Sequence, residues 1–219
     1  KKIRTKIPDN QALKKDQVKA SDFKFTDHDE TTHFSVMDSE GLVVSSTQTI
    51  NGWFGSGVVA QGTGVVLNNE MDDFATKAGA SNLFGAIGGA QNLVAPQKRP
   101  LSSMSPTIVL RYGKPFLALG TPSGTRILTC VAQTLINRLE FSLPLWESVS
   151  ALRYHQQWSP DQLRFEEVEI PAKLKNRLSE MGHNIVQKDL GCKIQAIEKE
   201  GTWIKAVSDP RGEGRALAQ

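Results

Sequence analysis

The stretch TTHFSVMDSEGLVVSSTQTIN, residues 31–51, decides the fold of this 219-residue chain. It holds two runs of alternating β-forming residues around the turn SEG, a pattern typical of an antiparallel hairpin. A three-residue loop that closes on a left-handed glycine pairs Asp38 with Leu42. The same register sets Thr31 opposite Thr49, close to the open end of the hairpin.

In this register the two faces of the hairpin differ in character. One face carries apolar side chains, namely Phe34, Val36, Leu42, Val44 and Ile50. The other carries mostly small polar side chains, namely Thr31, Ser35, Ser45, Thr47, Thr49 and Asn51. A slip of one residue would mix the two sets, which a half-buried strand pair avoids. The sequence therefore predicts that Thr31 and Thr49 lie side by side on a polar face.

The rest of the chain predicts an α+β fold. Residues 52–106 are rich in Gly, Asn and Asp and have little periodicity, and loops of that length are usually functional. Apolar spacing predicts the later elements: strands in PTIVLRY and PFLALG, helices over 124–141, 145–154 and 171–182, and strands near 184–188, 193–198 and 203–208. Strands, then helices, then strands favour layered packing over a parallel βαβ sheet.

Composition argues against several classes of function. The net charge of +3 is spread along the chain, and residues 1–30 resemble a solvated arm more than a nucleic-acid site. No apolar run is long enough to cross a bilayer. The two cysteines and four histidines show no metal-ligand spacing, so we expect no metal site. Cys130 lies in an apolar helical run, and we interpret it as a buried thiol.

Thr31 stands where the polar arm meets the first strand. A threonine hydroxyl becomes a nucleophile when a base takes its proton, and the α-amine of an N-terminal threonine can be that base. This amine titrates near ~7.7–8.0, which suits catalysis at neutral pH. Attack of the hydroxyl on the Glu30 carbonyl, followed by hydrolysis, would create such a terminus. Taken alone, Thr-Thr at the start of a strand is an ordinary feature.

Three further segments carry polar groups suited to a substrate. NNEMDDF brings Glu70 and Asp73 together, which suits an ammonium group or, alone, a hydrated acidic loop. PLSSMSP presents Ser102 and Ser103 between prolines, which suits a carboxylate or an ordinary turn. GTPSGTR leads into a helix whose first amides can receive an anion or an oxyanion. That segment lacks the Gly-Lys-Ser/Thr ending of a phosphate-binding loop.

In this order the segments TTHFS, TINGWFGS, NNEMDDF, KRPLSSMSPTIV, GTPSGTR and SDPR resemble the γ-glutamyltranspeptidase family. The resemblance runs from Thr31 to about Arg211. It implies the fold of N-terminal-nucleophile hydrolases, an αββα sandwich of stacked antiparallel sheets, and self-cleavage between Glu30 and Thr31. Residues 1–30 would then be the C-terminal arm of the large subunit, and residues 31–219 the catalytic small subunit.

The resemblance also implies a role for each site residue. Thr31 would be both the self-cleavage residue and the catalytic nucleophile, with Thr49 hydrogen-bonded to it. The backbone amides of Ser123 and Gly124 would form the oxyanion hole. The substrate-binding residues would be Thr49 and Gly124, with Asn51, Glu70 and Asp73 at the α-amino end of the γ-glutamyl group and Ser102 and Ser103 at its α-carboxylate. Arg126 and Arg153 would be structural ion-pair residues around the site.

Two residues depart from the family pattern. Ser123-Gly124 stands where the family usually has Gly-Gly, which would strain the oxyanion turn if the first position is left-handed. Phe84 stands in the lid over the site, about Met71 to Asn92, where a tyrosine is common. Phenylalanine can cover a pocket but cannot donate a hydrogen bond, so we expect more hydrolysis relative to transfer.

The activity implied is γ-glutamyl transfer from glutathione-like amides to an amino acid, peptide or water, without cofactor or metal. The implied partner is the large subunit of the same precursor, and family habit suggests a periplasmic or secreted protein. One alternative is a related acylase on the same scaffold, such as a cephalosporin or glutaryl acylase or a poly-γ-glutamate transpeptidase. Another is an unprocessed, non-catalytic homologue that binds glutamyl compounds.

Overall fold

The computed structural model describes residue 11 and residues 30–217, so the expected arm lies almost wholly outside the described residues. The strands are β1 Glu30–Met37, β2 Val43–Asn51, β3 Thr107–Arg111, β4 Lys114–Gly120, β5 Tyr154–His155, β6 Leu163–Phe165, β7 Ile185–Gln187, β8 Gln195–Glu200 and β9 Trp203–Ser208. The helices are α1 Ile127–Leu139, α2 Leu145–Ser150 and α3 Ala172–Glu180, with 3-10 turns η3 Glu70–Asp73, η4 Ala90–Asn92 and η5 Gly124–Arg126.

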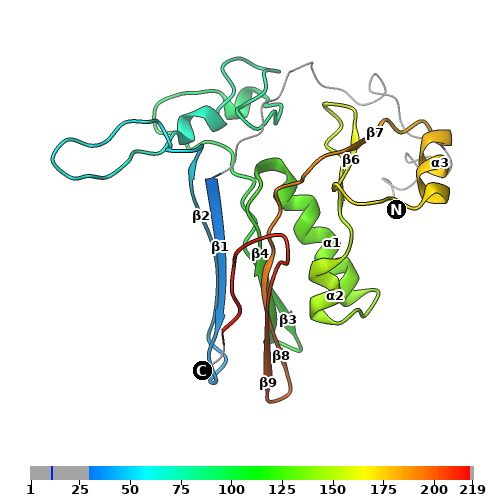
Figure 1. Ribbon diagram of the computed structural model, residues 1–219. Coiled ribbons are helices and arrows are strands. Elements are labelled where there is room, and N and C mark those ends of the chain that lie inside the picture. The colour runs from blue at the N-terminus through cyan, green and yellow to red at the C-terminus, as the bar shows by residue number, and fades with distance from the viewer. Residues whose placement is uncertain (1–10, 12–29, 218–219) are drawn as a thin grey trace.

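The elements form stacked layers (Figure 1). The β1–β2 hairpin lies against an antiparallel sheet of order β3-β4-β8-β9, and α1 and α2 cover the other face of that sheet. A smaller sheet, β5-β6-β7, packs against α3. The α+β fold with stacked antiparallel sheets is confirmed. No helix in the described part of the chain is both long and apolar enough to span a membrane.

The hairpin register agrees with the one expected from the sequence. Thr31 pairs with Thr49, the Asp38 amide donates to the Leu42 carbonyl at 3.1 Å, and Gly41 has a φ of 97°. The Asp38 carboxylate also accepts the amides of Gly41 and Leu42, at 2.7 and 2.8 Å. The turn is therefore fixed by both its glycine and its aspartate, and it holds the register as far as Thr31.

The polar face of the hairpin, rather than the apolar face, lies against the second sheet. Ser45 donates from Oγ to the Leu119 carbonyl at 3.1 Å, and Ser35 lies 3.5 Å from the Gln195 carbonyl. The apolar face is exposed in the described residues: Phe34 42%, Val36 52%, Leu42 71%, Val44 43% and Ile50 38%. Polar side chains fit between the sheets because backbone carbonyls there accept their hydrogen bonds.

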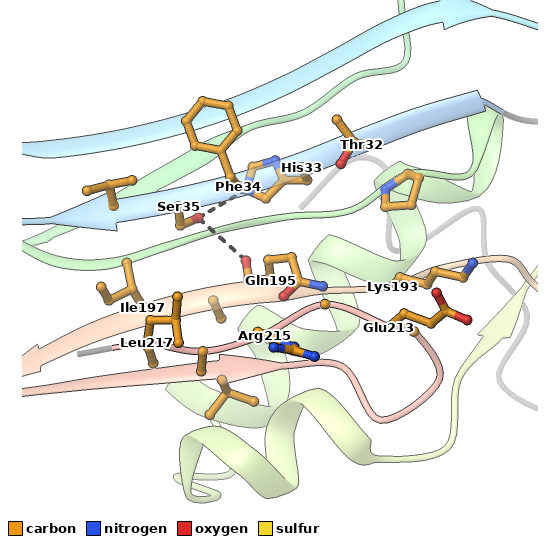
Figure 2. A pocket seen from close by; sticks show the side chains of 18 of the residues that line it. Thr32, His33, Phe34, Ser35, Lys193, Gln195, Ile197, Glu213, Arg215 and Leu217 are labelled. Atoms are coloured by element: carbon orange, nitrogen blue, oxygen red, sulfur yellow. Dashed lines mark hydrogen bonds between the residues drawn. The ribbon is translucent and has the colours of Figure 1, made fainter. Parts of the chain in front are cut away.

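His33 lies within this polar interlayer. Its Nδ1 is 2.7 Å from Thr47 Oγ1, and its Nε2 is 3.0 Å from Ser35 Oγ, as the dashed lines of Figure 2 show in part. Burial lowers the pKa of His33 to about 4, so the ring is neutral at physiological pH. At the turn end of the hairpin the interlayer becomes apolar, with Met37, Ala118 and Ile197 in contact.

The main core lies between the four-stranded sheet and α1 and α2. It includes Leu117, Leu119, Ile127, Val149 and Ile194, each no more than 1% exposed. Cys130 and Cys192 sit in this core and form a disulfide. The interpretation of Cys130 as a free thiol was therefore wrong: the cysteines are 62 residues apart in sequence, and only the fold brings α1 against the segment before β8.

Three elements also differ in their boundaries from expectation. The second helix ends at Ser150 rather than near residue 154, because Tyr154–His155 turns into strand β5. The expected helix over 124–141 divides into the turn η5 and helix α1. The expected strand near 193–198 is β8, Gln195–Glu200, which pairs with Trp203–Ser208 across a turn at Gly201.

Candidate active site

The Thr31 hydroxyl is positioned by the neighbouring strand. Its Oγ1 donates to Thr49 Oγ1 at 3.0 Å, and Thr49 Oγ1 also accepts the Asn51 amide at 2.8 Å. A bulge between Glu30 and Thr31 interrupts the ladder at this point. Bulges change the direction in which side chains point at the ends of strands. The regular pairing of β1 with β2 therefore begins at Thr31.

Asn51 connects this pair to the acidic segment. It is 2% exposed, with a φ of 76°, and its Nδ2 donates to the Asn69 carbonyl at 3.1 Å and to Asp73 Oδ1 at 3.2 Å. Asparagine tolerates a left-handed backbone better than most residues, which suits this position. Through Asn51, the structure brings Thr31, Thr49 and Asp73 into one hydrogen-bonded set.

Asp73 and Glu70 form a pair of carboxyls beside this set. Burial, together with the charge of Glu70, raises the pKa of Asp73 to about 7. Burial also raises the pKa of Glu70. Glu70 Oε1 is buried and has no hydrogen-bond partner among the described residues. Two adjacent carboxyls with this electrostatic cost form a site that a cation would stabilise.

The lid segment is tied to Asp73 by two asparagines. Asn82 and Asn92 donate from Nδ2 to the Asp73 carbonyl, at 3.2 and 2.8 Å. Asn82 Oδ1 also accepts the Phe84 amide at 3.0 Å. Phe84 is half-buried and lines a small cavity together with Asp73 and Ser103. The phenyl ring therefore lies near Asp73 and Ser103, and its role as a cover for the site stays a prediction.

The two serines of PLSSMSP have different surroundings. Ser103 lines the same small cavity and donates from Oγ to the Gly124 carbonyl at 2.8 Å. Ser102 is exposed, and its Oγ accepts the Met104 amide at 3.3 Å. In this chain Ser103 is the serine in contact with the GTPSGTR turn, and Ser102 lies at the edge of the site.

The GTPSGTR turn is strained at its centre. Ser123 has a φ of 113° and Gly124 a φ of 50°, and both residues are buried. A left-handed serine is disfavoured relative to glycine, so the strain anticipated at this departure from the family pattern is present. Within the part of the chain that the structure describes, neither amide donates a hydrogen bond. Such amides are available to an oxyanion.

The two arginines have different partners. Arg153 is 1% exposed and forms ion pairs with Asp209 and with Glu166, the latter at 3.9 Å, as expected of a structural residue. Arg211 closes this network by pairing with Glu166 at 2.7 Å and Asp209 at 3.1 Å. The segment SDPR supplies two members of the network, and sequence reasoning gave it no role. Arg126 donates from Nε to Ser123 Oγ at 2.8 Å.

Thr31 also borders a groove of about 540 Å³ that follows β1 (Figure 2). The opposite wall comes from Lys193, from β8 beginning at Gln195, and from the C-terminal segment with Arg215. The nucleophile expected from the sequence is therefore beside open space. Neither Lys193 nor Arg215 was singled out from the sequence, because only the fold brings them to β1.

Comparison with known proteins gives a consistent assignment. The family model described as gamma-glutamyltranspeptidase matches residues 1–219. The chain is 41% identical over 96% of its length to a glutathione hydrolase proenzyme of Escherichia coli, of which it covers 36%. It is 46% identical over 86% of its length to that of Pseudomonas aeruginosa, of which it covers 34%. The chain thus spans about a third of the length of these relatives.

Solved structures agree. An acivicin-inhibited γ-glutamyltranspeptidase superposes with a TM-score of 0.80 at 46% identity, over 84% of this chain and 100% of that one. The enzyme from Pseudomonas nitroreducens superposes with a TM-score of 0.81 at 44% identity, over 86% and 99%. A cephalosporin acylase from Bacillus halodurans, at 23% identity and a TM-score of 0.68, shares the fold. The fold is that of the N-terminal-nucleophile hydrolases, and the chain belongs to the γ-glutamyltranspeptidase family.

Proposed function

We propose that this chain is the catalytic portion of an enzyme that transfers or hydrolyses the γ-glutamyl group of glutathione and related amides. Thr31 becomes N-terminal when the Glu30–Thr31 peptide bond is cleaved. Its amine then takes the hydroxyl proton while Oγ1 attacks the γ-carbonyl. The tetrahedral oxyanion collapses, the leaving amine takes the proton, and a γ-glutamyl ester remains on Thr31. Water or an amino acid then attacks the ester and regenerates the hydroxyl.

One observation carries this proposal. The hydrogen-bonded set Thr31–Thr49–Asn51–Asp73 joins a candidate nucleophile to a candidate ammonium site through contacts of 3.2 Å or less. A γ-glutamyl group has its α-ammonium and its reactive carbonyl on one short chain, so it needs both features close together. Glutaryl groups lack the ammonium and would leave the carboxyl pair without a cation. The carboxyl pair therefore favours a γ-glutamyl substrate over the glutaryl substrates of related acylases.

The exposed apolar face of the hairpin supports a heterodimer with the remainder of the precursor. Phe34, Val36 and Val44 are each more than 40% exposed on a strand pair that is central to the site. Large contiguous apolar surfaces usually mark an interface. The relatives are named proenzymes and are about three times as long as this chain. We assign this face to the large subunit, which would supply the outer layer of the sandwich.

The Cys130–Cys192 disulfide supports an oxidising compartment, since such bonds are rare in reducing cytosol. We therefore propose that the protein is exported, to the periplasm or outside the cell. Localisation of the full precursor by fractionation tests this directly. Retention of an active enzyme in the cytosol, with both thiols free, would contradict it.

Self-cleavage is tested by intact mass on the full precursor. We expect wild type to yield two chains that separate between Glu30 and Thr31, and Thr31→Ala to stay intact. Thr32→Ala is the matched control, because Thr32 is the neighbouring threonine on the opposite, exposed face of β1. It should cleave as wild type does. A wild-type precursor that stays intact would support the non-catalytic homologue instead.

Substrate class is tested on the cleaved enzyme with paired anilides. We expect turnover of γ-glutamyl anilide and roughly a hundredfold less turnover of glutaryl anilide, because the latter leaves the carboxyl pair unpaired. Asp73→Asn should reduce the difference in turnover between the γ-glutamyl and the glutaryl anilide. Equal or preferred turnover of the glutaryl substrate would favour the acylase alternative.

A further inference from the structure

The strained backbone at Ser123 is held by its own side chain. Ser123 is fully buried and left-handed, a conformation in which glycine would be the favoured residue. Its Oγ donates a short hydrogen bond to the Leu190 carbonyl. A glycine at this position would remove the strain, but it would also remove this contact. The serine therefore adopts a strained backbone conformation and in return forms a hydrogen bond to a segment distant in sequence.

Arg126 completes the connection. Its Nε donates to Ser123 Oγ at 2.8 Å and to the Leu190 carbonyl at 2.7 Å. Arg126 is 5% exposed, so these bonds form away from solvent, where hydrogen bonds to a charged donor are strong. The hydroxyl, the guanidinium and the carbonyl thus form a closed triangle, which we call the Ser123 latch.

The far side of the latch is itself anchored. Leu190 is fully buried, and two residues later Cys192 is joined by the disulfide to Cys130 on α1. Gly191 packs so closely that an added Cβ would lie 2.9 Å from Ser123 Oγ. The disulfide thus ties the segment that carries this carbonyl to α1.

The near side of the latch is the turn proposed to hold the oxyanion. The Gly124 carbonyl accepts the Ser103 hydroxyl at 2.8 Å, which fixes the next peptide unit as well. Both the Ser123 and Gly124 amides lie within this doubly held segment. Preorganised amides stabilise a transition state because no reorganisation is needed when the charge develops. A looser turn would bind the ground state almost as well but would stabilise the oxyanion less.

We propose that the Ser123 side chain is a positioning residue: with Arg126 and the disulfide-anchored Leu190 carbonyl, it aims the oxyanion-hole amides. The proposal rests on the proposed function, because it concerns the same reaction. It also gives a role to a serine at a position whose backbone conformation favours glycine. The hydrogen bond from the Ser123 hydroxyl to the Leu190 carbonyl holds the strained backbone in place.

The test compares Ser123→Gly and Ser123→Ala in the self-cleaved full enzyme. Both should lower kcat for γ-glutamyl anilide by roughly tenfold or more while KM changes less than about twofold, since the effect falls on the transition state. Both variants should also bind a γ-boronate inhibitor, which forms a tetrahedral adduct with Thr31, less tightly than the wild type does. The affinity for L-glutamate should be nearly unchanged. Ser148→Ala is the matched control: Ser148 is also buried and donates to backbone carbonyls, but in α2.

The glycine variant makes the test decisive. If strain were the only effect of Ser123, Ser123→Gly would match or exceed the wild-type kcat, and that result would overturn the latch. Because glycine relieves the backbone, this variant is expected to fold even if Ser123→Ala does not. If Ser123→Gly folds but cleaves itself slowly, the latch is supported, since self-cleavage passes through an oxyanion too. A wild type without cleavage or turnover would refute the proposed function, and the latch with it.

Discussion

Substrate binding should release a proton from the carboxyl pair. The pKa of Asp73 is raised to about 7 by burial and by Glu70, while Asn51 holds its carboxylate from the other side and Asp72 adds a further negative charge. An arriving α-ammonium favours the ionised form. Free enzyme that carries the proton must therefore lose it on binding, and affinity should rise with pH up to the pKa of Asp73.

The magnitude follows from the ionised fraction. With a pKa of about 7, Asp73 is roughly a tenth ionised at pH 6 and half ionised at pH 7, so affinity should rise about fivefold over this interval. Calorimetry with L-glutamate, in buffers of different ionisation enthalpy, should count roughly 0.9 protons released at pH 6 and 0.5 at pH 7. This interval lies below the titration of the Thr31 amine, near ~7.7–8.0.

Two variants separate Asp73 from its neighbour. Asp73→Asn should weaken binding and remove both the pH dependence and the proton release. Asp72→Asn should keep both, with a slightly lower midpoint of the pH dependence, because Asp72 is exposed and its charge is the smallest of the causes that raise the pKa of Asp73. Affinity that is flat from pH 6 to pH 7 in wild type, with no buffer dependence of the heat, would refute the reasoning.

Three further outcomes are expected. Replacing Cys130 and Cys192 together by alanine should lower the free energy of unfolding by about 4 kcal/mol, the chain-entropy value for a loop of 62 residues, as measured by urea unfolding of the precursor; a change below about 1 kcal/mol would contradict it. Gly120→Ala should cost about 1–3 kcal/mol in the same assay, because its Cβ would lie 2.3 Å from the His33 ring; an unchanged midpoint would mean that the ring can move. Phe84→Tyr should raise the transfer-to-hydrolysis ratio roughly twofold or more by adding a hydrogen-bond donor to the lid; an equal ratio in product analysis would count against a role for that donor.

The parts of the fold that could be predicted from the sequence are those fixed by local rules. The register that pairs Thr31 with Thr49 follows from one turn and from the alternation of side chains. The helix after GTPSGTR follows from apolar spacing, and its start needs no long-range information. These features are set by neighbours within one hairpin or one helix, so a single sequence contains what is needed.

Other features could not be predicted because they depend on which segments meet in space. Nothing near Cys130 indicates that Cys192 will reach it, and nothing in SDPR reveals that Asp209 will pair with Arg153. The sequence also did not reveal which face of the hairpin packs against the second sheet. Alternation defines two faces, but whether the polar one turns inward depends on acceptors such as the Leu119 carbonyl, supplied by a distant strand.

The polar interlayer between the sheets has a consequence for the proposed self-cleavage. A strand held only by non-directional apolar contacts could slide or fray once the peptide bond before its first residue is cut. Here the Ser45 hydroxyl donates to the Leu119 carbonyl and the Ser35 hydroxyl, which His33 also contacts, donates to the Gln195 carbonyl, so directional bonds fix the hairpin on the sheet beneath it. A chain end made by cleavage before Thr31 would therefore stay where the uncut backbone had placed it.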